Sequence, residues 1–328
     1  MDRSQAMRTF DGAPGGAPSF VAVDWGTTTF RAYLATAAGD SLAMVRTDRG
    51  ILSVRDGRFE LALAEAIAPW LREHGNLPVL MAGMIGSRQG WRDVRYAACP
   101  ARIADFARSI ATVEAGSFGG VGPLRVGIVA GMAVTGDGRL PDVMRGEETQ
   151  VLGALARLRL ADGTFVLPGT HAKWVTVVDG AITGFRTYMT GEVFAALKGH
   201  TILGRLMSGE GGTGGGFQRG LETARGSDGG PGRFLHLIFS ARSRGLMGEI
   251  AECDLADYLS GLLVGAEIAD AAVGARRVAI IADAVLADRY RIACAHFGLE
   301  ATVAPADCAV AGLAAIANAA GWIKGARS

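Results

Sequence analysis

The sequence has few of the residues that build metal clusters and disulfide frameworks. Its 328 residues include four cysteines, Cys99, Cys253, Cys294 and Cys308, and five scattered histidines. No two cysteines have CxxC or zinc-like spacing, and no HExxH motif occurs. This usage argues against a zinc-built fold and is typical of a reduced, cytoplasmic protein.

The chain also lacks an excess of charge of either sign and a long apolar run. Its 33 basic residues are balanced by 32 acidic ones, for a net charge of +1, which gives no support to nucleic acid or a membrane surface as the main partner. The most apolar stretch, residues 309–323, is too short for a membrane span and is interrupted by Asn318. Residues 1–19 lack the apolar core of a secretory signal and predict a disordered leader.

The chain does have enough length and apolar content for two cored domains. Hydrophobic residues make up 49% of the 328, and two domains are typical of this length. Strand and helix patterns follow one another in two rounds, which predicts two α/β domains of related topology, residues 20–146 and 147–328. The predicted helices are residues 59–74, 147–160, 191–206, 254–271, 286–297 and 309–322. The predicted strands are residues 21–24, 30–35, 41–46, 78–82, 126–130, 174–178, 182–188, 277–282 and 302–303, with a further strand beginning at 164.

A turn built on Gly-Thr occurs twice, each time between an apolar strand and the strand that leaves from it. The first copy has Gly26 and Thr27, and the second has Gly169 and Thr170. Glycine lets the backbone approach an anion, which the backbone N–H groups and the threonine hydroxyl can then bind. The repeat indicates an ancient duplication, with chance similarity of two short hairpins as the alternative. Two such turns predict phosphate-binding hairpins that face each other across a cleft, as phosphoryl transfer needs.

Three acidic residues are placed where phosphoryl transfer would use them. Asp24 ends the first buried strand, where a carboxylate can hold Mg²⁺ beside a phosphate, although an aspartate at a strand end commonly caps a turn. Glu147 and Glu148 open a helix, where an acid can accept the proton of an attacking hydroxyl. They also suit the helix dipole on a solvated face. Considered alone, each residue fits its structural role better.

Basic residues accompany the second Gly-Thr turn and several strand ends. Lys173 lies two residues after His171, so both are expected on one side of a strand, and His171 fits a structural hydrogen-bonding role. Arg88, Arg145 and Arg186 lie near glycine-rich or strand-end positions, where an arginine can bind a carboxylate through two hydrogen bonds. An exposed surface arginine is the equal alternative for each.

A glycine-rich run at residues 208–216 also has two interpretations. It has no GxxxxGK[ST] spacing and precedes no recognisable helix start. A flexible surface loop is therefore favoured over a nucleotide-binding loop.

Several longer strings carry a family resemblance. Residues 22–32 resemble the first phosphate hairpin of the actin-like ATPase superfamily, which includes sugar kinases, acetate kinase and heat-shock chaperone ATPases. More narrowly, the chain from about residue 20 to its C-terminus resembles the 2-dehydro-3-deoxygalactonokinase family. The strings are residues 24–28 (DWGTT), 81–87 (MAGMIGS), 144–150 (MRGEETQ), 168–174 (PGTHAKW), 185–192 (FRTYMTGE) and 260–267 (SGLLVGAE).

The resemblance implies ATP-dependent phosphorylation of the 6-hydroxyl of 2-dehydro-3-deoxy-D-galactonate, a step of galactonate breakdown. It also implies two ribonuclease-H-like (actin-like ATPase) α/β domains flanking a cleft that holds ATP and Mg²⁺, with Asp24 at the metal. In related sugar kinases the catalytic carboxylate precedes the helix that leads to the second phosphate hairpin. That place falls here on Glu147 or Glu148, and we choose Glu147 as general base because it directly follows Gly146.

The resemblance and the positions of residues together give a full expected site. The nucleotide-binding residues are expected to be Asp24, Gly26, Thr27, Thr28, Gly169, Thr170, Lys173, Gly265 and Asp283. The substrate-binding residues, inferred from position, are Ser87, Arg88, Arg145, Arg186 and Tyr188, with Arg88 or Arg186 on the substrate carboxylate. Members of the superfamily usually have glycine where Asp283 stands, so this residue either bonds the ribose or weakens ATP binding.

Two other functions stay open at this point. One is a related kinase for another sugar or sugar acid. The other is a slow nucleotide-gated ATPase or binding protein that couples domain closure to a partner. A small sugar-acid molecule is the expected partner in the leading interpretation, and a homodimer is the expected assembly for such kinases.

Overall fold

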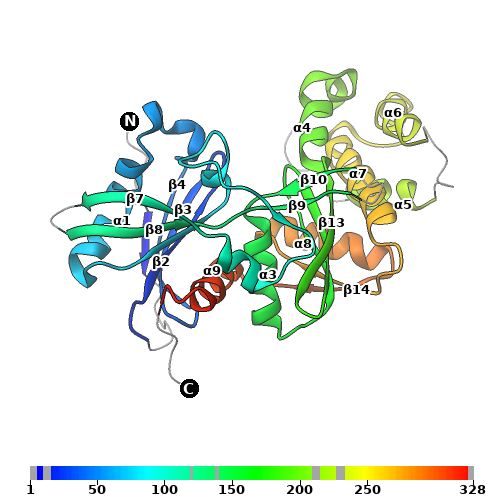
Figure 1. Ribbon diagram of the computed structural model, residues 1–328. Helices are drawn as coiled ribbons and strands as arrows, with labels where there is room; N and C mark the ends of the chain where they lie inside the picture. The colour runs from blue at the N-terminus through cyan, green and yellow to red at the C-terminus, as the bar shows by residue number, and fades with distance from the viewer. Residues whose placement is uncertain are drawn as a thin grey trace. The chain divides into compact units, whose positions relative to one another are not determined.

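The computed structural model describes residues 6–9, 16–118, 121–136, 140–208, 215–226 and 233–323 (Figure 1). The chain divides into two compact units. Unit 1 comprises residues 1–162, 176–185 and 305–328, and unit 2 comprises residues 163–175 and 186–304. The expected boundary between residues 146 and 147 divides the chain by its sequence repeat, and it stays a prediction.

Unit 1 contains a seven-stranded mixed sheet with the order β1-β4-β3-β2-β5-β8-β7. Its strands are β1 (Ala6–Thr9), β2 (Phe20–Trp25), β3 (Phe30–Ala35), β4 (Ser41–Thr47), β5 (Val79–Ala82), β7 (Ala111–Phe118) and β8 (Val121–Ile128). The central strand β2 pairs antiparallel with β3 and parallel with β5, which in turn pairs parallel with β8. All of β2 is buried except Asp24, which is half-buried. Asp24 therefore lies at the carboxyl end of the central strand, next to Ala82 of β5.

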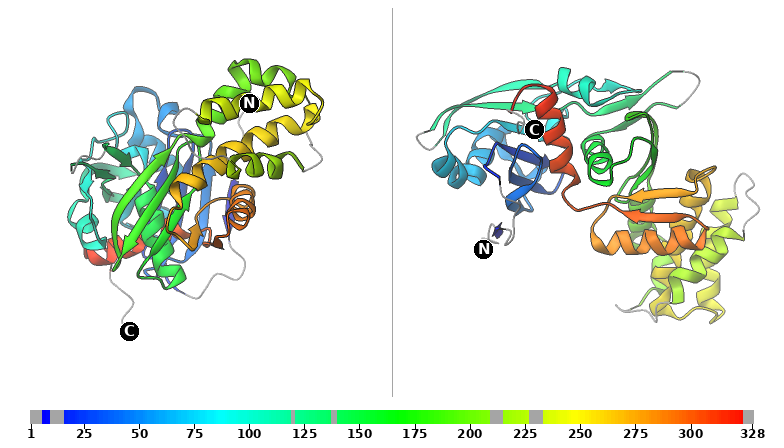
Figure 2. Two further views of the ribbon diagram at one scale, coloured as in Figure 1. Left: turned by 90° about the vertical axis from the view of Figure 1, so that its right-hand side faces the viewer. Right: turned by 90° about the horizontal axis from the view of Figure 1, so that it is seen from below.

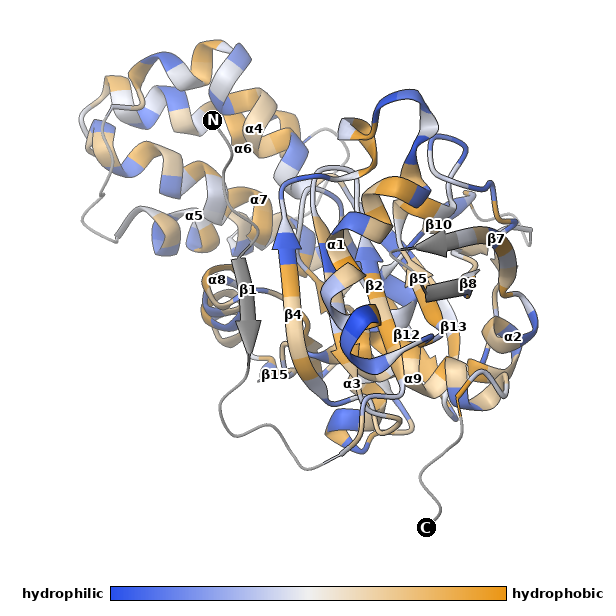
Figure 3. Ribbon diagram, turned by 90° about the vertical axis from the view of Figure 1, so that its left-hand side faces the viewer, coloured by the Kyte–Doolittle hydropathy of each residue, from blue (hydrophilic) through white to orange (hydrophobic). Residues whose placement is uncertain are grey.

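Helices cover both faces of this sheet. Helix α1 (Phe59–His74) forms one hydrophobic core with β2, in which Leu63 packs with Val21 and its strand neighbours, and Figure 3 shows α1 over the apolar strands β2 and β4. Because side chains alternate along a strand, Ala22 faces the opposite side. Helix α9 (Cys308–Ala319) lies there against β2, as Figure 2 shows.

Helix α3 (Glu147–Leu158) crosses α9 with the two backbones in contact. A Cβ at Gly153 would lie 1.8 Å from the Cys308 carbonyl oxygen, and a Cβ at Gly312 would lie 1.8 Å from the Thr149 carbonyl oxygen. The crossing therefore requires glycine at both positions. It fixes the helix that begins with Glu147 and Glu148 against the sheet-covering helix α9.

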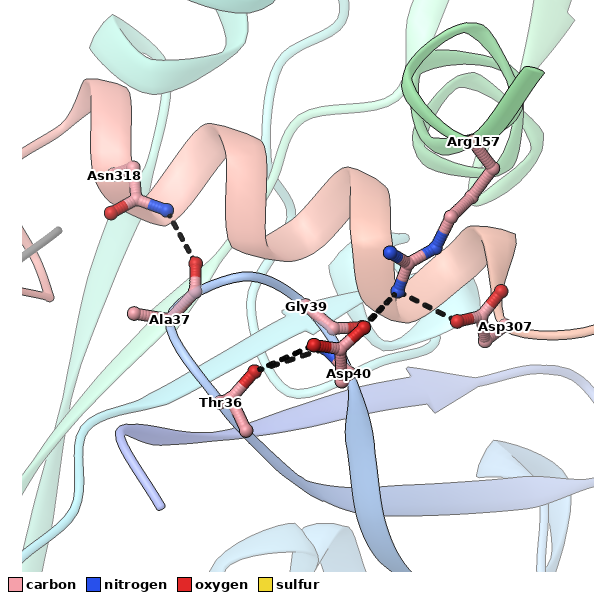
Figure 4. A network of polar contacts seen from close by, with 7 residues as sticks. All are labelled: Thr36, Ala37, Gly39, Asp40, Arg157, Asp307 and Asn318. Carbon is pink, nitrogen blue, oxygen red and sulfur yellow. Dashed lines mark hydrogen bonds and ion pairs between the residues drawn. The ribbon is translucent and has the colours of Figure 1, made fainter. Parts of the chain in front are cut away.

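An arginine ties the turn between β3 and β4 to both of these helices (Figure 4). The Arg157 Nη2 atom, near the end of α3, lies 3.1 Å from Asp40 Oδ1 and 2.7 Å from Asp307 Oδ2. The Asn318 amide of α9 donates to the Ala37 carbonyl at 2.8 Å. Because the three charged side chains are less than a third exposed, salt screens these ion pairs less than surface ones.

The second main sheet has the order β13-β12-β11-β14-β15. Its strands are β11 (Gly163–Leu167), β12 (Ala172–Val178), β13 (Ala181–Tyr188), β14 (Arg277–Ile280) and β15 (Glu300–Val303). The β12–β13 turn has positive φ at Asp179 (49°) and Gly180 (70°), as a two-residue type I′ hairpin turn requires. β11, β14 and β15 pair in parallel. Both sheets thus place a hairpin on one side of their first strand and parallel strands on the other, which confirms the expected pair of ribonuclease-H-like α/β folds.

The helices of unit 2 include a closely packed pair. They are α4 (Thr190–His200), α5 (Gly215–Arg225), α6 (Arg233–Leu246), α7 (Leu255–Ala271) and α8 (Ala284–His296). A Cβ at Gly220 of α5 would lie 2.2 Å from the Tyr258 carbonyl oxygen, and one at Gly261 of α7 would lie 2.0 Å from the Phe217 carbonyl oxygen. Glycines therefore let the α5 and α7 backbones touch.

The structure corrects several sequence expectations. The leader predicted over residues 1–19 contains β1, which pairs with β4; its residues 1–5 and 10–15 lie outside the described part. The helix predicted over 191–206 ends at His200 and is followed by a 3₁₀ turn, Ile202–Leu206. The glycine-rich run, whose residues 209–214 are also outside the described part, does precede a helix, because α5 begins at Gly215. A Cβ at Gly216 would lie 2.3 Å from the Asp254 carbonyl oxygen, directly before α7, so this close approach explains one glycine of the run.

The shorter elements of unit 1 were not expected from sequence. They are helix α2 (Ile103–Arg108) and a three-stranded sheet of β6 (Ala97–Ala98), β9 (Met132–Val134) and β10 (Asp142–Met144), in the order β10-β9-β6. In the part of the chain that the structure describes, no helix combines the length and apolar character needed to cross a membrane.

Candidate functional site

Asp24 is the acidic group at the carboxyl end of the central strand of unit 1. Its side chain is 16% exposed, and its Oδ2 atom accepts a hydrogen bond from Arg31 Nη1 at 3.1 Å. Burial raises the pKa of Asp24, while the charge and hydrogen bond of Arg31 oppose that rise. The carboxylate is thus held in a fixed place by one cation.

The first Gly-Thr turn follows Asp24 and packs against a second loop, which contains Gly50 and Ile51. The Gly26 N–H donates to the Thr29 carbonyl at 2.9 Å, which closes the turn, and the Ile51 N–H donates to the Gly26 carbonyl at 3.0 Å. A Cβ at Gly50 would lie 2.2 Å from the Thr27 carbonyl oxygen. Thr27 and Thr28 are exposed. The turn therefore presents two hydroxyls on a rigid backbone, as an anion-binding turn requires.

Two glycines bring the ends of three elements together at Asp24. Gly83, directly after β5, has φ of 93°, and a Cβ there would lie 2.8 Å from the Trp25 carbonyl oxygen and 3.3 Å from Asp24 Oδ1. Gly146, directly before α3, has φ of 110°, and its Cβ would lie 3.2 Å from Gly83 Cα. The start of α3 therefore packs on Gly83, the residue that lies beside the aspartate. The expected site did not include Gly83, although a glycine that directly follows a buried strand was the signal in the sequence.

The two glutamates at the start of α3 have different surroundings. Glu148 is fully buried, and both of its carboxylate oxygens accept from the Gly146 N–H, at 2.8 and 2.9 Å. Glu147 is half-buried, and its Oε2 accepts from the Arg145 N–H at 2.9 Å. Burial, followed by the neighbouring charge of Glu147, raises the pKa of Glu148 to about 8. Of the pair, only Glu147 has solvent access.

Replacing Glu148 by glutamine is expected to change how stability depends on pH. The pKa of Glu148 is about 8 in the folded chain, against about 4.3 for an ordinary glutamate. Between these values the folded state keeps a proton that the unfolded state has lost, so this residue lowers the free energy of unfolding as pH rises. Glu148→Gln removes that contribution. In denaturant unfolding from about pH 5 to 8, the free energy of unfolding of the variant should therefore rise relative to that of the wild type.

The matched control for this experiment is Glu65→Gln, whose side chain is 53% exposed. It should follow the wild-type pH dependence. If the difference in free energy of unfolding between wild type and Glu148→Gln stayed constant across this pH range, the raised pKa would be contradicted.

The arginines and the serine expected near the substrate in unit 1 differ in access. The Arg145 side chain is buried, lies 4.3 Å above the Tyr96 ring, and donates from Nη2 to the Val94 carbonyl at 2.8 Å. Its Nε and Nη1 atoms have no hydrogen-bond partner among the described residues and no exposed surface. The Arg88 side chain is 92% exposed, and its Nε atom lies 3.6 Å from Asp93 Oδ2. The Ser87 hydroxyl donates to a local carbonyl, so Arg88 is the most accessible of these groups.

The second Gly-Thr turn lies in unit 2, against the start of α4. A Cβ at Gly191 would lie 2.4 Å from the Gly169 carbonyl oxygen, and the Glu192 N–H donates to the Thr170 carbonyl at 3.0 Å. The Glu192 carboxylate also pairs with His171, which agrees with a structural role for that histidine. Thr170 is exposed, so the turn offers its hydroxyl outward.

The expectation that His171 and Lys173 share one side of a strand is wrong. Strand β12 begins only at Ala172, so His171 belongs to the turn and is exposed, whereas Lys173 is buried. The Lys173 ammonium donates to the Thr187 hydroxyl of β13 at 2.7 Å. The alternation rule does not apply across the strand end.

Arg186 and Tyr188 of β13 make contacts that close the end of helix α7. Arg186 pairs with the Asp270 carboxylate at 3.1 Å and donates to the Asp270 and Ala271 carbonyls, which satisfies carbonyls that a helix end leaves open. The Tyr188 hydroxyl donates to the same carboxylate at 2.5 Å. These contacts account for both residues, and their substrate roles stay predictions.

Gly265 and Asp283 likewise have structural explanations. Gly265 lies on α7, where a Cβ would come within 2.6 Å of Ala224 Cβ of α5, so helix packing explains this glycine. Asp283 is the N-cap of α8, and its carboxylate accepts from the Val285 and Leu286 N–H groups at 3.0 and 3.1 Å. A capping aspartate typically stabilises a helix by about 1 kcal/mol relative to alanine. The departure from glycine at position 283 therefore has a local cause, and its effect on nucleotide binding stays open to test.

Comparisons with known proteins add a family to this geometry. A family model described as 2-keto-3-deoxy-galactonokinase matches residues 24–316. Over 305 residues, or 92% of this chain, the sequence is 35% identical to a Rhizobium meliloti (strain 1021) protein assigned as a 2-dehydro-3-deoxygalactonokinase, of which 97% is covered. It is 32% identical over the same length to the 2-dehydro-3-deoxygalactonokinase of Escherichia coli (strain K12), of which 98% is covered. A crystal structure of a Sinorhizobium meliloti protein assigned to this activity superposes with a TM-score of 0.80 at 35% identity, covering 92% of this chain and 98% of that one.

Proposed function

Because the chain belongs to the 2-keto-3-deoxy-galactonokinase family, we propose that unit 1 carries the acid–base and metal-binding groups of a sugar-acid kinase. The family membership makes the protein a phosphotransferase of galactonate catabolism that uses ATP, with 2-dehydro-3-deoxygalactonate as the sugar acid. The observation that supports the site proposal is the packing of Gly146, at the start of α3, on Gly83, whose own Cβ position lies 3.3 Å from Asp24 Oδ1. The 6-hydroxyl as acceptor is part of the proposal.

Glu147 acts in this proposal as the general base. Its carboxylate has solvent access, and its Oε2 is oriented by the Arg145 N–H. It accepts the proton of the sugar-acid hydroxyl as that oxygen attacks the terminal phosphorus of ATP, and the bond from this phosphorus to the bridging oxygen breaks so that ADP leaves. Glu148 accepts the Gly146 N–H with both carboxylate oxygens and so keeps the start of α3 in place.

Asp24 fits the role of a Mg²⁺ ligand. Magnesium in phosphoryl-transfer sites is usually held by one or two carboxylates together with substrate phosphates. Asp24 supplies one carboxylate, with Oδ2 paired to Arg31 and Oδ1 on the side of Gly83. Among the described residues no group of three or more His, Cys, Asp or Glu side chains could hold a metal ion, which suits an ion bound partly by nucleotide. Magnesium bound there would neutralise charge on the transferred phosphoryl group.

The Gly-Thr turns hold the phosphates in this proposal. In unit 1, Gly26 shapes the turn through its own bonded N–H and carbonyl, and Thr27 and Thr28 offer exposed hydroxyls. Gly169 and Thr170 form the corresponding turn in unit 2. Their exposed threonines and supported backbones favour this role. Glycine-containing turns of this kind bind phosphate through N–H groups that point outward.

Arg88 is the proposed partner of the substrate carboxylate. It is accessible, whereas Arg145 is closed off and Arg186 is engaged by Asp270. A planar guanidinium can bind a carboxylate through two parallel hydrogen bonds. We further propose a cytoplasmic location, which the absence of disulfides among the four cysteines supports.

A coupled ADP-release assay with ATP and Mg²⁺ tests the function directly. We expect release to be fast with 2-dehydro-3-deoxygalactonate and slow without an acceptor, because acceptor binding completes the site. The panel should include its gluconate epimer and common sugars. Fast release with a different acceptor would favour a related kinase, and slow release with every acceptor would favour a nucleotide-gated ATPase.

A further inference from the structure

Glu267 of α7 is a buried carboxylate of unit 2 that accepts hydrogen bonds from three other elements. Glu267 is only 3% exposed. Trp174 of β12 donates from Nε1 to Oε1 at 2.7 Å, and the Tyr290 hydroxyl of α8 lies 2.9 Å from Oε2 and 3.0 Å from Oε1. The Thr190 hydroxyl, at the start of α4, donates to Oε2. Glu267 therefore connects α7 with β12, α8 and α4.

Burial disfavours the charged form of the Glu267 carboxylate, and hydrogen bonds from three neutral donors partly compensate for this loss of solvation. Burial raises the pKa of Glu267, and the hydrogen bonds from Thr190, Trp174 and Tyr290 oppose that rise. A buried polar group that loses such a partner destabilises the local structure. The position of each donor is thus linked to the carboxylate.

The Thr190 contact leads directly to the second Gly-Thr turn. The next residue, Gly191, packs so closely on the turn that a Cβ there would lie 2.4 Å from the Gly169 carbonyl oxygen and 2.9 Å from Thr170 Cα. The Glu192 N–H then donates to the Thr170 carbonyl at 3.0 Å. The turn rests on the start of α4, and Glu267 holds that start through Thr190.

We propose that Glu267 is a positioning residue that fixes the Gly169–Thr170 turn through Thr190. The inference rests on the proposed function, in which this turn binds a phosphate of ATP. Trp174 lies four residues after Thr170, on the strand that leaves the turn. Its hydrogen bond to Glu267 is a second contact between the carboxylate and the same hairpin. Tyr290 links the arrangement to α8, the helix that Asp283 caps. Glu267 itself does not touch the nucleotide.

Paired threonine variants test the proposal. Thr190→Val keeps the side-chain shape and removes the hydroxyl, whereas Thr190→Ser keeps the hydroxyl. Amide hydrogen exchange of the segment 168–174, measured without nucleotide, should be faster in Thr190→Val and Glu267→Gln than in wild type and unchanged in Thr190→Ser. Calorimetry should show ADP binding weakened by about 3- to 10-fold in the first two variants, as for loss of one hydrogen bond, with the Michaelis constant for the sugar acid unchanged.

The two readouts separate this proposal from the proposed function. If Thr190→Val exchanges at the wild-type rate in segment 168–174, the positioning role is wrong, even if Glu267→Gln fails to fold. If exchange rises as expected but wild-type protein binds no ADP, the positioning role stands and the nucleotide role of the turn is wrong. If exchange rises, ADP binding weakens and Thr190→Ser behaves as wild type, both are supported.

Discussion

Glu147→Gln is expected to lower turnover by ~10²–10⁴-fold, the usual loss when a general base is removed. Glutamine keeps the oxygen that can accept the Arg145 N–H, so the start of α3 should not move. Because ATP binding does not require this carboxylate, the affinity for ATP should stay nearly unchanged. Steady-state turnover with 2-dehydro-3-deoxygalactonate, together with calorimetric ATP binding, measures the two effects separately.

The neighbouring substitution Glu148→Gln is the matched control for this prediction. Glu148 is fully buried and faces the Gly146 N–H with both oxygens, so the variant should retain most of its turnover. The reverse result, with Glu147→Gln active and Glu148→Gln inactive, would transfer the base to Glu148. That outcome would require the start of α3 to rearrange during the reaction.

Asp24→Asn is expected to lower turnover by on the order of 10²-fold or more, because the carboxylate that would hold Mg²⁺ next to the phosphates is lost. Asparagine is nearly isosteric and can still accept from Arg31, so the end of β2 should keep its place. The remaining activity should depend only weakly on Mg²⁺ concentration. A Mg²⁺ titration of turnover in wild type and variant measures this change.

Arg31→Met separates the metal role of Asp24 from its ion pair. This variant keeps the carboxylate and removes the cation that lies 3.1 Å away. Because the carboxylate remains, its turnover should still rise with Mg²⁺ concentration, in contrast to that of Asp24→Asn. If Asp24→Asn also kept the wild-type Mg²⁺ dependence, the metal role would be rejected, and the ion pair would be the function of Asp24.

The regular elements could be predicted because their patterns are local. The strands that became β2, β3 and β4 and the helix that became α1 were located to within about two residues from alternation and helical spacing. The start of α5 was missed because Gly215 and Gly216 belong to the glycine-rich run that the sequence favours as a loop. The close approach of Gly216 to the Asp254 carbonyl oxygen, 2.3 Å from a Cβ there, is not visible in the sequence. β1 was missed because its pairing with β4 is not visible in its own four residues.

The candidate site was only partly predictable for the same reason. The sequence placed Asp24 and Gly26 at the end of a buried strand, where the structure has them. It expected Arg88 or Arg186 at the substrate carboxylate; the structure pairs Arg186 with Asp270 at the end of α7, and its substrate role stays a prediction. A side chain that is polar and near a glycine is compatible with either role, and only its neighbours in space distinguish them.

The sequence by itself determined the two Gly-Thr hairpins, the repeated strand order and the family, because these depend on short strings and on local periodicity. The tertiary structure alone decided which of two adjacent glutamates is buried, since that follows from the positive φ of Gly146 and its packing on Gly83. It also decided the role of Glu267, whose donors Thr190 and Trp174 are 77 and 93 residues away in the chain. Burial and hydrogen bonding are set by residues that only folding brings together, so the chemistry of these carboxylates could not be read from their positions in the sequence.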